Sequence, residues 1–257
     1  MKHIILILVF ISSLTAGVLS SQLISVDEKT STANIKIDKI DIGMSGFISH
    51  EIVEGHSVIL KNIEVLSFDT VSKIATLKMT SYDALRNNSL PKGKWKVEVG
   101  DTAILAFGYT RGVLIAPDAE IYYRITRSVK DLQWVHPDIF ATILSFHGHP
   151  TPLREDFKNL SISNSIGLIF LFLDQKLYTV DSKSFKILNI SDAPLKQTEI
   201  KLPFYSRVDE IEANWFGAGS SELEHYELHY FKLLSKANPE NTKLKEAIKS
   251  FKMKAKK

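Results

Sequence analysis

The sequence contains no cysteine, and this absence removes several kinds of chemistry at once. No disulfide can cross-link the fold, no lipid-modified N-terminal cysteine can anchor it, and no thiolate can act as a nucleophile or zinc ligand. The sequence also shows no internal repeat and no low-complexity linker. The chain must therefore be held together by ordinary hydrophobic cores, and 257 residues are enough for one or two of them.

Long hydrophobic runs are lacking as well. The most apolar one, Ile4 to Ile11, is shorter than the roughly 20 residues that a membrane-spanning helix needs. It follows Lys2 and His3, and small and polar residues lead from it to the small-x-small sequence Val18-Leu19-Ser20. This order is typical of a signal peptide. We therefore predict a signal peptide over residues 1–20 and an exported protein, with an uncleaved membrane anchor as the alternative.

The body of the chain lacks an excess of positive charge. The formal net charge is +3, yet residues 232–257 contain nine lysines against two glutamates, a balance of +7. Lys2 is the only charge in residues 1–20, so residues 21–231 carry −5. A globular nucleic-acid-binding protein needs cations on a folded face to neutralise phosphates, so we expect no nucleic acid partner.

Recognisable catalytic motifs are also missing. No serine lies in a Gly-x-Ser-x-Gly sequence. Gly217-Ala218-Gly219 lacks the third glycine of a nucleotide-binding loop. His147 and His149 flank Gly148, which we interpret as the end of a helix, because no cysteine or second carboxylate cluster stands nearby to complete a metal site. We predict that the protein is not an enzyme and has no metal and no cofactor.

A second histidine pair, His225 and His229, has the i, i+4 spacing of half a zinc-protease motif. The glutamate stands at position 227 rather than directly after the first histidine, so a general base would point elsewhere. We interpret the pair, together with Tyr226 and Tyr230, as an amphipathic helix surface.

The residues that are present indicate an α+β fold. Short runs of alternating apolar and polar residues dominate residues 34–117 and predict a β-rich subdomain, a small barrel or sandwich. Residues 118–234 predict an α+β subdomain with a helical segment, a three-stranded antiparallel meander and a helix at Ser221–Leu234. Residues 235–257 predict a lysine-rich amphipathic tail whose final helix starts near Asn238.

Local signals place these elements more closely. Predicted strands in the first subdomain include Ile35–Ile37, Gly46–Ile48, Ser57–Leu60, Ile63–Leu66, Ile74–Met79, Trp95–Val99, Thr102–Phe107 and Val113–Ile115. Helices are predicted to begin at Pro117, at His136-Pro137-Asp138 and, for a shorter one, at Thr151-Pro152, and the meander strands are Ile166–Leu173, Lys176–Val180 and Ser184–Ile190.

Five runs together are similar to a known family: Val99-Gly100-Asp101, Leu114–Pro117, the apolar strand ending near Leu173, Ser184–Leu188 and Pro203–Val208. In order and spacing they resemble the N-terminal domain of the plasminogen-binding protein family (PgbA-type) of epsilon-class Gram-negative bacteria. The similarity covers roughly Ile35 to Leu234. It implies a surface-exposed protein that captures host plasminogen through lysines and has no catalytic role.

The chain departs from that family after the shared domain. Family prototypes carry a long, highly charged Lys/Glu extension there, whereas this chain has only the segment from Lys232 to Lys257. If plasminogen binding belongs to the extension, the shared domain has another role, such as anchoring or assembly in the envelope. The predicted location is therefore the cell surface and outer membrane, or the periplasm.

Plasminogen capture through lysine has a definite chemistry. A kringle lysine pocket presents paired carboxylates to the ammonium, a cation to the carboxylate and an aromatic trough to the methylenes. As the last residue, Lys257 offers both charged ends, which an internal lysine such as Lys254 does not. We take Lys257 as the principal ligand by hypothesis, with Lys256 and Lys254 adding screened attraction.

The tail has alternative uses. Leu244, Ile248 and Phe251 lie at i, i+4 and i+7 between lysines, as in a basic amphipathic helix. Such a helix can lie on an anionic membrane surface. The same apolar stripe could instead dock on another envelope protein or on the acidic body of the chain itself.

Overall fold

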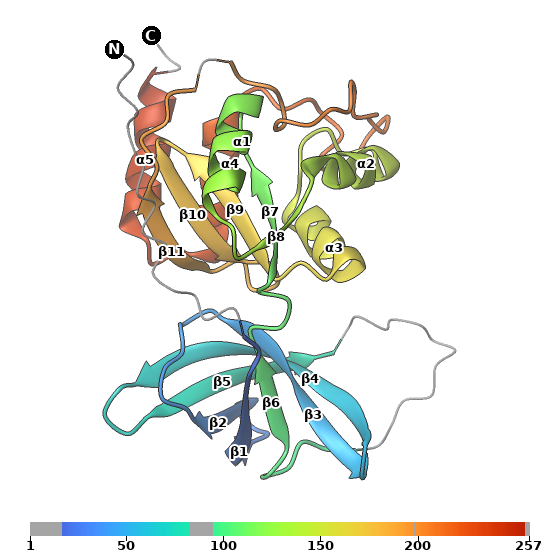
Figure 1. Cartoon of the computed structure of the whole chain (residues 1–257), viewed down its shortest axis with the longest axis vertical. Coiled ribbons are helices and arrows are strands. Elements are labelled where there is room, and N and C mark those ends of the chain that lie inside the picture. The colour runs from blue at the N-terminus through green and yellow to red at the C-terminus, as the bar shows by residue number, and fades with distance from the viewer. Residues whose placement is uncertain (1–16, 83–94, 198, 255–257) are drawn as a thin grey trace. The chain divides into compact units, whose positions relative to one another are not determined.

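The computed structural model describes residues 17–82, 95–197 and 199–254. The chain divides into two compact units, one over Gly17–Tyr109 and one that begins at Thr110 (Figure 1). The boundary lies before strand β7 (Arg111–Ile115), whereas the sequence pattern placed it at residue 117. β7 belongs to the second unit because its backbone pairs with strands there. The predicted α+β class is confirmed.

The first unit is a closed six-stranded antiparallel barrel in the order β1-β2-β5-β4-β3-β6 (Figure 1). Its strands are β1 (Leu19–Asp27), β2 (Thr32–Lys36), β3 (Ser45–Val53), β4 (His56–Asp69), β5 (Ile74–Ser81) and β6 (Thr102–Leu105). β1 was not predicted, although it closes the barrel by pairing with both β2 and β6. Its first two residues, Leu19 and Ser20, fall inside the range predicted as signal peptide.

One predicted strand, Trp95–Val99, does not form. The reason is a local turn, in which the backbone N–H of Glu98 donates to the Asp101 carboxylate at 2.8 Å and Gly100 takes a φ of 97°. These bonds hold the segment away from a strand ladder. The turn delivers Asp101 to the start of β6, as expected for Gly100-Asp101.

The barrel interior is filled by apolar side chains, among them the fully buried Leu23, Ile35, Ile48, Leu77 and Leu105. β3 and β6 approach each other closely at Gly46, where a Cβ atom would collide with the backbone carbonyl of Ile104. Glycine is required at this position because only a missing side chain permits that approach.

The second unit contains a five-stranded mixed sheet in the order β11-β10-β9-β7-β8. The predicted meander is present as β9 (Leu168–Leu173), β10 (Lys176–Asp181) and β11 (Ile187–Asp192), all antiparallel. β7 extends it by pairing in parallel with β9 and with β8 (Gln133–Val135). All six residues of β9 are buried, as expected for a central strand covered on both faces.

Five helices are described in this unit: α1 (Ala119–Ser128), α2 (Pro137–His147), α3 (Arg154–Asn164), α4 (Tyr226–Ala237) and α5 (Thr242–Lys254). The Asp118 side chain caps α1 by accepting from Ile121 N–H at 2.8 Å, and Gly148, with a φ of 67°, ends α2. α3 is as long as α2, not shorter. α4 begins at Tyr226, later than the predicted Ser221.

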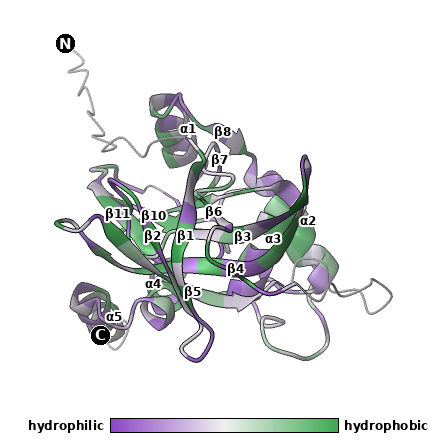
Figure 2. Cartoon of the chain, turned by 90° about the horizontal axis from the view of Figure 1, so that it is seen from below, coloured by the Kyte–Doolittle hydropathy of each residue, from purple (hydrophilic) through white to green (hydrophobic). Residues whose placement is uncertain are grey.

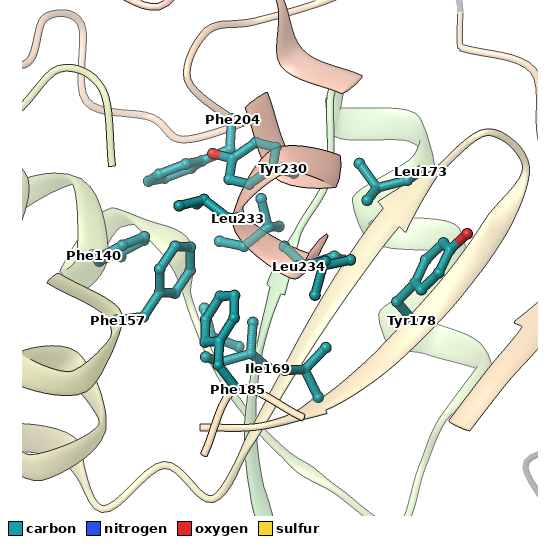
Figure 3. Packing of buried hydrophobic residues seen from close by; sticks show 14 of the residues in the cluster. Phe140, Phe157, Ile169, Leu173, Tyr178, Phe185, Phe204, Tyr230, Leu233 and Leu234 are labelled. Carbon is teal, nitrogen blue, oxygen red and sulfur yellow. The ribbon is translucent and has the colours of Figure 1, made fainter. Parts of the chain in front are cut away.

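The core of the second unit joins the sheet to α2, α3, α4 and α5. Figure 3 shows side chains from α2, α3, α4 and the sheet in this core. Phe140 of α2 stacks on Phe204, with ring centroids 5.2 Å apart, and contacts Phe157 of α3 at 4.5 Å. Tyr226 and Tyr230 of α4 are also inside, with exposed fractions of 2% and 0%. The interpretation of the His225/His229 segment as an amphipathic surface is therefore wrong for its two tyrosines, because tertiary packing buries both rings.

Candidate functional site

The lysine-rich C-terminal segment begins on α4 and continues through α5. Asn238 connects the two helices and is almost fully buried. Its side chain donates to the carbonyls of Phe185 and Leu234 and accepts from Ile187 N–H at 3.0 Å. A nearby ion pair joins Lys186 to Glu240 at 3.3 Å. These bonds fix the turn between α4 and α5 to the β10–β11 hairpin.

The apolar stripe predicted in this segment faces the body of its own unit. Leu244 is 1% exposed, and Ile248 and Phe251 pack against the core cluster. The ring of Phe251 lies 5.8 Å from that of Phe231 in α4. This packing uses the apolar surface that a membrane-binding helix would need, so the membrane alternative for the stripe stays a prediction. Of the three alternatives, docking on the chain's own body is the one that the packing shows.

Docking of the stripe turns lysines outward. In Figure 2, much of α5 has the colour of hydrophilic residues. Five lysines of α4 and α5 are exposed: Lys232, Lys236, Lys243, Lys245 and Lys249. Glu240 and Glu246 are the only acidic residues between positions 232 and 257, so this is a strongly cationic helix pair. Such a surface attracts acidic groups of a partner at long range, within the limits of salt screening.

Of the three predicted lysine ligands, Lys254 alone lies in the part of the chain that the structure describes. Lys254 is the last residue of α5. Lys256 and Lys257 lie outside the described residues. The hypothesis that Lys257 is the principal ligand therefore stays a prediction.

A separate cluster of metal-ligand type lies where α2 ends and α3 begins. The Nδ1 atoms of His147 and His149 lie 3.1 Å and 2.9 Å from Oδ1 of Asp156. Asp156 is 1% exposed, and its Oδ2 accepts from Leu153 N–H at 2.8 Å. One ligand atom from each of the three side chains lies within 4.8 Å of the other two. Both histidines stand out in the sequence, whereas Asp156 was not predicted as a site residue, because its only local signal is its place in the first turn of a predicted helix.

The other histidine pair does not form a site. His225 precedes α4, and its side chain makes no capping hydrogen bond. His229 turns toward another segment, with Nε2 2.9 Å from the Pro152 carbonyl oxygen. Burial, the main cause, lowers the pKa of His229, so the neutral ring is favoured. The His229 imidazole is therefore engaged with the Pro152 backbone.

Within the described ranges, no helix is both long enough and apolar enough to cross a membrane. This finding concerns residues 17–82, 95–197 and 199–254 alone.

Comparison with known proteins identifies relatives of most of the chain. The family model described as "Plasminogen-binding protein pgbA N-terminal" matches residues 18–234. Two curated relatives, both called plasminogen-binding protein PgbA and both from Helicobacter pylori, strains J99 and 26695, are 24% identical over 200 residues. The match covers 77% of this chain but 43% of each relative, less than half of their length. No solved structure matches the chain.

Proposed function

Because the chain belongs to the family of the plasminogen-binding protein PgbA N-terminal domain, we propose that it is an exported, non-catalytic binding protein of the cell envelope that captures plasminogen. The family match over residues 18–234 carries this proposal, and the names of the two relatives supply the partner. We assign the contact to lysines of the C-terminal segment, with Lys257 as principal ligand and Lys256 and Lys254 as helpers.

The chemistry of the helix pair supports this assignment. Exposed lysines follow α4 and α5 and lead toward the end of the sequence. A terminal lysine adds what these internal lysines lack, a free carboxylate beside the ammonium. The cationic helices would raise the rate of encounter with the acidic lysine pockets of plasminogen, and the terminal group would provide the specific contact.

The test is plasminogen binding to the purified chain that ends at Lys257. In the test variant Lys254, Lys256 and Lys257 are replaced by alanine. The matched control replaces three exposed barrel lysines, Lys29, Lys39 and Lys78, and so makes the same change in net charge. We expect about a tenfold or greater loss of affinity in the tail variant alone, the scale of one or two charge-assisted contacts.

A lysine analogue added in solution should compete with the natural chain for plasminogen. Equal binding by the tail variant and the natural chain would rule out the terminal lysines as ligands. Removing all residues after 234 is not a suitable substitute, because Leu244 belongs to the core of the second unit.

A second candidate function follows from where the family match ends. The match stops at residue 234, before Lys254, Lys256 and Lys257, so the shared part of the family includes none of the three proposed ligands. The alternative is therefore that the domain has a structural or assembly role in the envelope and binds a partner protein there. In that case the natural chain would not bind plasminogen, and a strain lacking the protein would show a leakier outer membrane in a dye-uptake assay.

Export and exposure are parts of the proposal that cells can test. Protease treatment of intact cells, with detection of the C-terminal segment, separates display on the surface from residence in the periplasm. Digestion of that segment is expected for a plasminogen-binding surface protein. If the segment survives in intact cells but is digested after lysis, capture of plasminogen by intact cells is excluded.

The position of the signal-peptide cut can be argued from β1. Four residues of β1, Leu19 to Gln22, pair with β6 and close the barrel. A cut directly after Ser20 would remove half of this pairing. We therefore expect the exported chain to begin at Leu19 or earlier, as N-terminal sequencing of the protein from the envelope fraction can show. A mature chain that begins at Ser20 or later would contradict this expectation.

A further inference from the structure

We propose that His147, His149 and Asp156 form a binding site for one divalent transition-metal ion of the zinc class. The three side chains come from two helix ends and the short connection between them. The site goes beyond plasminogen capture and does not depend on it.

The geometry of the three ligand atoms fits one shared ion. Two ligand atoms on a tetrahedral zinc ion, at bond lengths of about 2.0–2.1 Å, stand about 3.4 Å apart. Here Nδ1 of His147 is 3.1 Å from Asp156 Oδ1, and Nδ1 of His149 is 2.9 Å from Oδ1 and 3.0 Å from Oδ2. Small rotations of the two rings would open these distances by a few tenths of an ångström. Three protein ligands leave a fourth position for water.

The charge balance at Asp156 favours a cation. A carboxylate taken out of water needs a compensating positive charge, or it is expensive to bury. In the part of the chain that the structure describes, the ion pairs of Asp156 are with the two imidazoles alone, and these are charged only when protonated. A divalent ion between the three groups would supply the positive charge while both rings stay neutral.

The site is also held in place before any ion arrives. Gly148, in the left-handed conformation, reverses the chain between the two histidines, and added side-chain atoms there would collide with Asn214. Asn214 in turn donates to the His147 carbonyl at 2.6 Å and, from its backbone, to the Gly148 carbonyl at 3.1 Å. A fixed set of ligands loses less entropy on binding than a mobile set.

The ligand types select the kind of metal. Two imidazole nitrogens and one carboxylate oxygen suit zinc and its neighbours in the transition series. Calcium and magnesium prefer sites made of oxygen ligands.

The experiment uses the full chain without a polyhistidine tag, stripped of metal with a chelator that is then removed. Cobalt(II) is titrated in, and its visible absorption reports ligand binding. We expect saturation at one ion per chain, with zinc displacing the cobalt. Failure to reach a saturable level of one ion per chain would overturn the proposal.

Matched variants locate the ion. His147→Asn and His149→Asn keep a side-chain donor near the place of Nδ1 but remove the imidazole ligand. We expect each to lower the cobalt affinity by about a hundredfold or more, at least as much as the loss of a supporting residue around a metal. The control is His50→Asn in the barrel, where a single histidine contacts a carboxylate, Asp101, at 2.7 Å. The control should bind as the natural chain does.

Circular dichroism shows whether the variants keep their fold. If the variants do not fold, nitrogen-15 NMR spectra of the imidazoles in the natural chain test the assignment instead. Zinc should then shift the resonances of His147 and His149 and leave that of His50 in place. Undiminished cobalt binding in folded His147→Asn and His149→Asn variants, or zinc shifts at other histidines instead, would contradict the assignment.

Discussion

Several buried polar side chains in the second unit meet backbone groups of distant segments. The single O–H of Tyr226 is shared between the carbonyls of Ile115 and Phe172, at 3.0 Å and 3.2 Å, which joins α4 to β7 and β9. The hydroxyl of Tyr230 donates to the Pro203 carbonyl at 2.9 Å. Burial raises the pKa of both tyrosines well above its usual value. Single residues of α4 therefore act as polar links within an apolar core.

His229 gives a prediction of pH dependence. Its pKa is lowered in the folded chain, chiefly by burial, while in the unfolded chain it returns to about 6.5. The contribution of neutral His229 to the free energy of unfolding is therefore fully present above about pH 6.5. It is lost as the pH falls through the lowered pKa of the folded chain, because the unfolded chain binds the proton more readily. We expect the free energy of unfolding to decrease between about pH 7 and pH 5, and His229→Gln to flatten this decrease.

Urea denaturation across that pH range measures the effect. The control is His56→Gln in the barrel, at an exposed position. The pH dependence of the control should follow that of the natural chain. Equal slopes for the natural chain and His229→Gln would show that this histidine does not contribute to the pH dependence.

At the scale of elements, most local signals predicted the helices and strands correctly. Gly148 ends α2 where the sequence placed a helix end, because this signal depends on neighbouring residues. The first helix was predicted to begin at Pro117, whereas Asp118 is the N-cap and α1 begins at Ala119. β1 and α5 are different cases. β1 was not predicted, because its strand forms by pairing with the remote β6. The sequence left several docking partners open for α5, because the choice depends on packing against a remote part of the core.

Docking of α5 can be measured through Leu244. Replacement by alanine leaves a cavity where α5 meets the core cluster, since Leu244 is 1% exposed. We expect Leu244→Ala to lower the free energy of unfolding by about 2–4 kcal/mol. Lys245→Ala, the neighbouring exposed position, should change it by less than about 0.5 kcal/mol. Chemical denaturation of the three proteins decides the matter, and similar values for both variants would indicate that α5 is not docked.

At the scale of the whole molecule, the chain divides into a barrel and an α+β unit with separate cores. The barrel closes its own sheet and buries its own apolar residues. A domain of this size can bury enough surface to fold alone. The family match extends across both units, so membership in the family describes the pair rather than either unit by itself.

The barrel should therefore fold when residues 17–109 are produced in isolation. We expect a cooperative thermal transition and a well-dispersed amide spectrum, as for other small single domains. Gly46→Val in the same fragment should lose several kcal/mol of stability, because its side chain would collide with the Ile104 backbone. An unfolded fragment without the substitution would show that the barrel depends on the second unit.

The sequence by itself determined the α+β class, the end of α2 at Gly148, the meander and the family, and the lack of cysteine excluded disulfides. Only the tertiary structure decided that β1 closes a barrel, that β7 joins the second sheet, that the apolar face of α5 is covered and that Asp156 stands between two histidines. The physical reason is the distance along the sequence between the residues that interact. Caps, turns and periodicity act over a few residues, whereas strand pairing, burial and converging ligands join residues that the chain must fold to bring together.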